Sequence, residues 1–504
     1  MAINVDDLLN TNSPPSQVQR NHLQNVIFRL GEDISGINEQ ILAMQAKILV
    51  LQTRRTQLDQ QRRCYSSLLS PVRCLPIEIF GQIFVYATCD RPKHVLNLSA
   101  VCQLWRYAAL STPMLWSTLK LGRHVSRRNI DNHIDSWIER ARSYPLSLVI
   151  IDRYSFVDPV NIALPLITNH QLKSITLVSD DELERISSIL GKLEFSNLEM
   201  LESLSLETRF CSKFTPPDAL RYAPKLKTLN LNTLYHGKFE TLPFPWRQLT
   251  SLTITSWGNP DIGVDILQAC VNLEEFILDG YGPCEASYGD RSGPNDSITL
   301  NYLRKLHLQC NGRIFPLSLK TPSIQDFTIN SKSGYFLNLD FYDYIEKNGS
   351  TLLKLSIAPV HSRLIESIPY FRSLVELKLY DDNCNDEPMI FDILDSLVVE
   401  LEPEMDLSTI LLPRLEALEI VCHATERYQR MFMKVINSRW WSDEEENARQ
   451  KQGRRSLSRI KRSVLMNVHS ELNMFFSGDV DVLRTQGMSI EYLASYDGMD
   501  GEPY

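Results

Sequence analysis

The sequence lacks the features that would assign it to a metalloprotein, a membrane protein or a secreted protein. Its ten cysteines are scattered and form no C-x-x-C pair, so we expect no structural metal site, because zinc ligands cluster in short loops. No apolar stretch approaches the ~20 residues that span a bilayer. Residues 1–16 are polar and lack the apolar core of a secretory signal. We therefore expect reduced cysteines and a cytoplasmic or nuclear location, or both.

The sequence also lacks the common catalytic motifs. G-x-x-x-x-G-K-[ST], G-x-G-x-x-G, H-E-x-x-H and G-x-S-x-G are all absent, and the ten histidines are dispersed. We therefore expect a protein that is not an enzyme and that needs no cofactor.

What the chain does contain is an ordinary soluble composition. It has 504 residues, 43% of them hydrophobic and 22% charged, and a net charge of −9. This length accommodates two or three domains or one long repeat array. The acidic balance argues against a dedicated nucleic-acid-binding protein, which usually has a basic face.

A heptad pattern follows a polar segment, residues 1–18, that we expect to be disordered. Its core positions are Leu23, Ile27, Leu30, Ile34, Ile37, Ile41, Met44, Ile48, Leu51, Arg55 and Leu58. This spacing predicts a coiled-coil helix over residues 19–70. Isoleucine at position a with mostly leucine at position d favours a parallel homodimer through residues 23–58. The alternative is a helix that packs on its own chain.

Residues 71–121 predict a compact helical module. A first block reads Leu75-Pro76-x-Glu78-Ile79-x-x-x-Ile83-Phe84, in which the proline suits a helix start. Two further blocks follow, Val101-Cys102-x-x-Trp105-Arg106 and Ser111-Thr112-Pro113-x-Leu115-Trp116. About 50 residues make a small autonomous core, so a partner that covers one face would stabilise the module.

These three blocks resemble an F-box, in particular the F-box proteins that are abundant in mushroom-type fungi. The resemblance implies docking onto the small Skp-type adaptor of cullin–RING ubiquitin ligases and, through it, onto a cullin. The contact positions that it implies are Leu75, Pro76, Ile79, Ile83, Val101, Trp105 and Trp116. Ile77 departs from the pattern, where Pro or Asp is frequent. The alternative is that these residues only form the core of a helical bundle.

The middle of the chain repeats the pattern L-x-x-L-x-L ten times between residues 172 and 420, at intervals of 21 to 30 residues and one of 41. These intervals resemble those of irregular leucine-rich repeats, which span ~20–29 residues. We therefore expect an α/β solenoid with a parallel sheet on its inner face, formed by residues 152–423 and capped by a helix and a strand in 122–151. The long interval is a candidate for a degenerate repeat.

Strand alternation divides each repeat into buried residues and residues on the inner face. Early repeats present small polar residues on that face, and later repeats present charges and an aromatic ring. The candidates for substrate binding are therefore Glu275, Asp279, Lys305, His307, Lys354, Glu376, Lys378 and Tyr380. The alternative is a merely solvated face.

Three further segments have biased composition. Residues 280–297 are rich in Gly, Pro and Ser and predict an exposed loop. Residues 381–406 contain ten acidic residues and no Lys or Arg, so they predict either a solvated edge or an attraction for basic substrates. Residues 424–504 lack the repeat and predict a C-terminal cap with a charged loop, of which 449–462 is strongly basic.

Together these patterns predict the substrate-recognition subunit of a cullin–RING ubiquitin ligase. The F-box-like module would bind the adaptor, the repeats would bind a protein substrate, and catalysis would occur elsewhere in the ligase. The alternative is a leucine-rich-repeat scaffold that acts outside the ligase. Neither prediction involves a metal, a membrane or nucleic acid.

Overall fold

A computed structural model describes the chain with gaps. The described residues are 14–88, 91, 93–122, 130–152, 165–179, 189–208, 216–233, 242–256, 264–280, 298–309, 319–330, 339–360, 363–381, 389–399, 410–422, 426–442, 445, 457–467 and 477–494. The predicted loop at 281–297, most of the basic segment at 449–462 and residues 1–13 lie outside them. The chain forms two compact units, residues 1–83 and 84–504.

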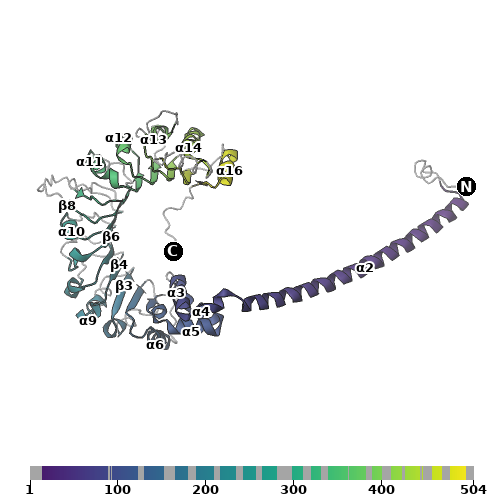
Figure 1. The fold of residues 1–504 in the computed structure, drawn as a ribbon. Coiled ribbons are helices and arrows are strands. Elements are labelled where there is room, and N and C mark those ends of the chain that lie inside the picture. Colours follow the sequence, from purple (N-terminus) through teal and green to yellow (C-terminus); the bar gives the residue numbers. More distant parts are fainter. Residues whose placement is uncertain are drawn as a thin grey trace. The chain divides into compact units, whose positions relative to one another are not determined.

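The first unit is dominated by one helix, α2 (Gln17–Leu68), which is 52 residues long (Figure 1). Ser16 begins it with a capping box, because its hydroxyl accepts from the Gln19 amide while its own amide donates to the Gln19 side chain. No proline interrupts the run before Pro71, which opens the short 3-10 helix η1 (Pro71–Cys74). None of the residues in α2 is buried.

The predicted helical module consists of short helices. These are α3 (Ile77–Thr88), α4 (His94–Val101), α5 (Gln103–Ser111) and the 3-10 helix η2 (Pro113–Trp116). Pro113 stands at the first turn of η2, where its missing N–H leaves no hydrogen bond unmade. The strand β1 follows η2 directly.

The second unit contains a 14-stranded parallel sheet whose strands follow one another in chain order. The strands are β1 (Thr118–Leu121), β2 (Leu146–Asp152), β3 (Leu172–Ser179), β4 (Ser203–Thr208), β5 (Thr228–Thr233), β6 (Ser251–Ser256), β7 (Glu275–Gly280), β9 (Lys305–Gln309), β11 (Asp326–Asn330), β12 (Lys354–Ala358), β13 (Glu376–Asp381), β14 (Ala417–Cys422), β15 (Arg462–Asn467) and β16 (Ser489–Ala494). Two short strands, β8 (Ile298–Thr299) and β10 (Leu319–Lys320), pair separately.

Parallel neighbours require the chain to leave the sheet and return between strands. Among the described residues of these connections, the α-helices are α6 (Ile130–Ala141), α9 (Phe195–Leu198), α10 (Val264–Ala269), α11 (Leu339–Asn348), α12 (Leu364–Ser367), α13 (Met389–Leu397), α14 (Glu426–Arg439) and α16 (Ser477–Thr485). Figure 1 shows them on one side of the sheet. We call the opposite side of the sheet the open face.

The predicted strand alternation is present. In β4, Leu204 and Leu206 are buried while Ser203 and Ser205 are half-buried, and β7, β9 and β11 repeat this pattern. Each buried leucine removes a side chain from water, which stabilises the fold by ~1.5–3 kcal/mol. The core therefore lies between the sheet and its helices.

Two features of the sheet differ from the expectation. The 41-residue interval between two repeats contains no additional strand of this sheet, because β13 pairs directly with β14. The segment beyond residue 424 does more than cap, since β15 and β16 extend the same parallel sheet. The repeat pattern does not include them, because Ser463 replaces the second leucine of the unit in β15 and Gly487 replaces the leading leucine before β16.

Candidate protein-binding surfaces

The helix α3 has apolar residues on its buried side and also on an exposed side. Phe80 and Phe84, four residues apart, are buried. Ile79, Ile83 and Tyr86 follow the i, i+4, i+7 spacing of a second helical face, and Ile83 is 46% exposed. The backbone carbonyl of Pro76 accepts from the Ile79 and Phe80 amides, so this proline fixes the start of the helix.

The helices α4 and α5 also expose large apolar side chains. Val101 is 60% exposed and Tyr107 is 64% exposed, whereas Ala108 and Ala109 on the opposite side of α5 are buried. Trp105 is half-buried, with its ring 5.1 Å from that of Phe84. Exposed apolar residues close together on a surface are typical of sites that bind a protein partner.

The predicted contact positions differ in their accessibility. Leu75 is only half-buried and Pro76 is exposed, so both remain accessible. Trp116 is not accessible, because its side chain is only 1% exposed. Its indole N–H donates to the Ala109 carbonyl at 2.8 Å, and its ring meets the Trp137 ring edge-on at 4.8 Å. In this structure Trp116 therefore stabilises the core and offers no contact surface.

Seven exposed large apolar residues of the module were not among the predicted contacts. These are Val72, Tyr86, Leu96, Leu104, Tyr107, Leu110 and Met114. The sequence contained a signal for such exposed residues, because α3 and α5 each have more apolar residues than one buried helical face can accommodate.

On the open face, the sheet register places a row of alternating charges across five strands. The row is Glu275, Lys305, Asp326, Lys354 and Glu376, each facing the next across neighbouring strands. The Lys305 ammonium lies 2.7 Å from a Glu275 carboxylate oxygen, and this hydrogen bond lowers the pKa of Glu275. Lys354 lies 3.1 Å from Glu376. Ion pairs between strands therefore connect β7 with β9 and β12 with β13 in this row.

A second row lies two residues further along the strands. There Lys378 contacts Glu376 at 3.6 Å and Glu419 at 2.9 Å. The Tyr380 hydroxyl donates to Glu419 at 3.2 Å, and burial together with this carboxylate raises the pKa of Tyr380 to about 12. Burial lowers the pKa of His307, so its imidazole is mainly neutral at pH 7.

The structure brings most of the candidate substrate-binding residues into this one region. Asp279, whose partners in register are Thr255 and Gln309, lies on the third row of the same face. A cavity of about 310 Å³ is lined by Asp326, Thr328, Lys354, Leu355, Ser356, Glu376, Lys378 and Tyr380. Asp326 and Glu419 were not among the candidates. Only the strand register shows that they complete the charged rows.

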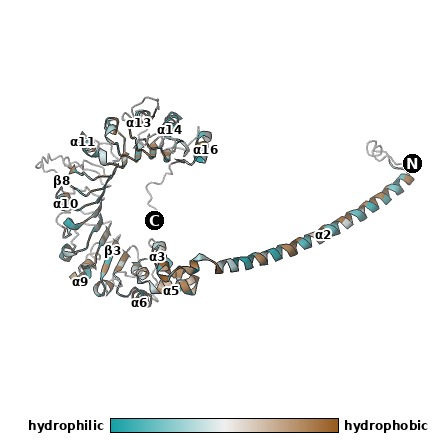
Figure 2. Cartoon of the chain, viewed as in Figure 1, coloured by the Kyte–Doolittle hydropathy of each residue, from teal (hydrophilic) through white to brown (hydrophobic). Residues whose placement is uncertain are grey.

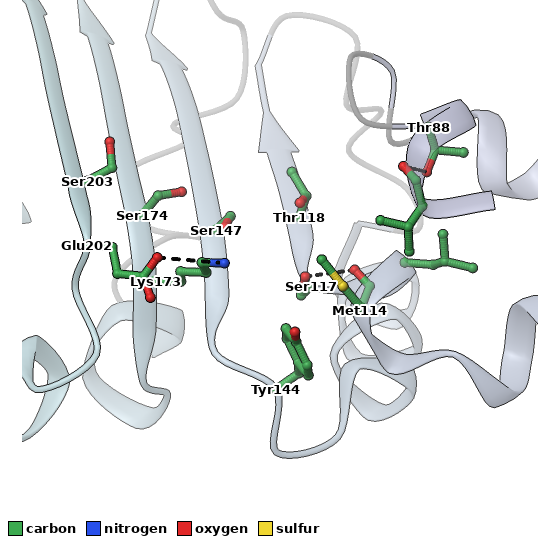
Figure 3. A pocket seen from close by; sticks show the side chains of 12 residues that line it. Thr88, Met114, Ser117, Thr118, Tyr144, Ser147, Lys173, Ser174, Glu202 and Ser203 are labelled. Atoms are coloured by element: carbon green, nitrogen blue, oxygen red, sulfur yellow. Dashed lines mark hydrogen bonds and ion pairs between the residues drawn. The ribbon is translucent and has the colours of Figure 1, made fainter. Parts of the chain in front are cut away.

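The early strands present a different open face. Thr118, Ser147, Ser174, Ser203, Thr228 and Ser251 continue the first row as hydroxyls. A second cavity of about 270 Å³ lies near β1 to β4, and Figure 3 shows the Lys173–Glu202 ion pair, 3.7 Å long, on its wall. The charges thus concentrate on β7 to β14.

The described residues offer neither a metal site nor a straight membrane span. No group of three or more His, Cys, Asp or Glu side chains among them could hold a metal ion. No single helix among them combines the length and the apolar character needed to cross a membrane, although α2 and η1 taken with α3 as one bent pair meet that test.

One comparison supports the F-box part of the resemblance. Residues 72–121 match the family described as F-box-like. No curated protein matches the chain. F-box domains bind Skp-type adaptors in ubiquitin ligases and are typically found in subunits without catalytic activity. Residues 72–121 are therefore an F-box-like domain, which supports placing this chain among the F-box proteins.

Proposed function

We propose that this protein is the substrate-recognition subunit of a cullin–RING ubiquitin ligase. The observation that carries the proposal is the F-box-like match together with the exposed apolar residues inside it, such as Ile83, Val101 and Tyr107. An isolated domain gains nothing from these residues in water, whereas an adaptor that covers them would stabilise it. The chain itself would contribute proximity and orientation to ubiquitin transfer.

We further propose that the parallel sheet is an irregular leucine-rich-repeat array. The support is the L-x-x-L-x-L pattern together with a sheet whose strands follow chain order, one strand to a repeat. In this proposal the open face of β7 to β14 binds the substrate. Its described strands carry five acidic residues and three lysines, so we expect the substrate segment to be basic. The five acids are Glu275, Asp279, Asp326, Glu376 and Glu419, and the lysines are Lys305, Lys354 and Lys378.

Co-expression with a Skp-type adaptor, followed by size-exclusion chromatography, tests the adaptor proposal. The wild type should co-elute with the adaptor, and Val101→Asp/Tyr107→Asp should not, because each new carboxylate would be buried without a partner. Val482→Asp is the matched control, since Val482 is 55% exposed but lies in α16.

Co-elution of the double variant would contradict the proposed surface. A folded wild type that never co-elutes would instead favour the scaffold that acts outside the ligase. Circular dichroism of each variant establishes that it is folded.

Quantitative pull-downs test the substrate surface. Proteins captured by the wild type should be lost with Glu376→Lys/Glu419→Lys, which reverses two charges on the open face. Glu366→Lys/Asp392→Lys makes the same charge change on exposed positions of α12 and α13. If both variants lose the same partners, net charge and not the open face governs binding.

A further inference from the structure

The helix α2 exposes many large apolar side chains. Its heptad positions from Ile27 to Leu58 are all exposed, and Figure 2 shows brown, hydrophobic residues alternating with teal, hydrophilic ones along much of its length. A helix in water depends mainly on packing of an apolar face, and no residue of α2 is buried. The regular spacing of a and d positions fits a second helix with the same spacing.

We propose that two copies of this chain associate through α2 as an antiparallel coiled coil. The sequence pattern of a and d residues alone favours a parallel pair, but the charges oppose it. In a parallel pair in register, Arg20, Arg55 and Arg62 would each occupy position a opposite the same arginine of the second copy. Three pairs of like charges would then face each other in the seam.

An antiparallel pair removes these contacts. We align α2 of one copy, from Gln17 to Leu68, with the whole of α2 of the second copy running in the opposite direction. The numbers of two facing residues then add up to 85. This full overlap brings every a position opposite a d position. The facing pairs are Ile27 with Leu58, Leu30 with Arg55, Ile34 with Leu51, Ile37 with Ile48, and Ile41 with Met44. Each pair occurs twice, as two-fold symmetry requires.

The charge distribution along α2 supports the same orientation. Residues 32–39 contain three acidic residues and no basic ones, whereas residues 47–55 contain three basic residues and no acidic ones. The antiparallel overlap places these two blocks side by side. Asp33 and Arg54, both at position g, then meet across the seam. In a parallel pair, Arg54 would instead face Asp59 of the second copy. Asp59 already forms ion pairs with Arg55 and Arg62 of its own helix, at 4.0 and 3.3 Å.

The orientation has a consequence for the assembly. A helix of 52 residues is about 78 Å long at ~1.5 Å per residue. In an antiparallel pair the two chains continue toward their F-box-like domains from opposite ends of this rod. If the proposed function holds, the dimer presents two separate adaptor sites, but the pairing itself does not depend on that function.

Light scattering during size-exclusion chromatography of the full chain tests the pairing. We expect twice the 58.0 kDa of one chain. Ile41→Lys/Ile48→Lys should weaken association at least ~100-fold, because each lysine would interrupt the apolar seam in both copies. Leu42→Lys/Leu49→Lys is the matched control, since both leucines lie beside the seam at position b. A monomer at high concentration, a larger oligomer, or equal loss in both variants would overturn the proposal.

Disulfide cross-linking tests the orientation. A mixture of an Ile37→Cys chain with an Ile48→Cys chain should give a 37–48 link, and neither chain alone should link through its new cysteine, because a disulfide needs Cα atoms within ~7 Å. Peptide mass spectrometry separates these links from those of the exposed Cys64, Cys74 and Cys102. Self-linking of Ile48→Cys without the mixed link would show a parallel pair and overturn the antiparallel one.

Discussion

Trp116 and Tyr107, two aromatic residues of the F-box-like domain, lie in opposite environments. Trp116 is buried and hydrogen-bonded, and the Arg140 guanidinium lies over its ring at 4.6 Å. Tyr107 is 64% exposed. Sequence pattern treats both as large aromatic residues of a small domain, yet only Trp116 has the contacts that stabilise the unbound chain.

We therefore predict different costs of truncation at these two positions. Trp116→Ala should lower the free energy of unfolding by ~3–5 kcal/mol, because it leaves a large cavity. Tyr107→Ala should change it by no more than ~0.5 kcal/mol. Urea denaturation followed by circular dichroism measures both values. Similar losses would show that Tyr107 is buried in solution.

Tyr380 gives a prediction about alkaline pH. Its folded-state pKa of about 12 exceeds the ordinary value of 10.0, so the folded chain keeps a proton that the unfolded chain loses. The stability from this group is complete below pH 10 and is lost as the pH rises toward 12. Tyr380→Phe should therefore lose less stability than the wild type over this interval in urea denaturation. Identical pH profiles would contradict the raised pKa.

Among the elements, each strand directs one set of side chains into the core and the other onto the open face. In β12, Leu355 is 1% exposed beneath the helices, while the neighbouring Lys354 is exposed on the open face and pairs with Glu376. Ion pairs on exposed surfaces contribute little, since water already solvates both charges. The open face can therefore vary without loss of the fold.

A comparison within β12 tests this division. Leu355→Ala should destabilise the protein by ~2–5 kcal/mol. Lys354→Met should cost less than ~1 kcal/mol. Thermal and urea unfolding of the two variants provide the measurement. An equally large effect of Lys354→Met would mean that the charged row holds the sheet together.

Within the molecule as a whole, α2 differs from the second unit. No residue of α2 is buried, whereas the parallel sheet of the second unit buries the apolar residues of each repeat against the helices and the adjacent repeats. The stability of the second unit should therefore not depend on α2.

Deletion of residues 1–68 tests this independence. We expect the unfolding midpoint of the remaining chain to stay within ~2 °C of the wild type, since a larger shift would need a lost contribution near 1 kcal/mol. Light scattering should show that the shortened chain no longer self-associates. A markedly lower midpoint would indicate that α2 packs on the rest of the chain.

Features that depend on local periodicity could be predicted from the amino-acid sequence alone. The heptads of α2, the alternating strands and the three blocks of the F-box-like domain are patterns within short windows, and short windows fix helix and strand geometry. The parallel sheet followed from repetition of one such unit. The strand β15 was missed because Ser463 occupies the position at which the neighbouring strands β13 and β14 have Leu377 and Leu418.

The tertiary structure alone shows which apolar residues are buried. It alone also shows which charged residues are neighbours. Trp116 and Val101 are both apolar positions of one motif, but one is buried and the other exposed. Asp326 joins Lys305 and Lys354 only through the register of β9, β11 and β12. These outcomes depend on contacts between residues far apart in the chain, and local sequence patterns carry no information about such contacts.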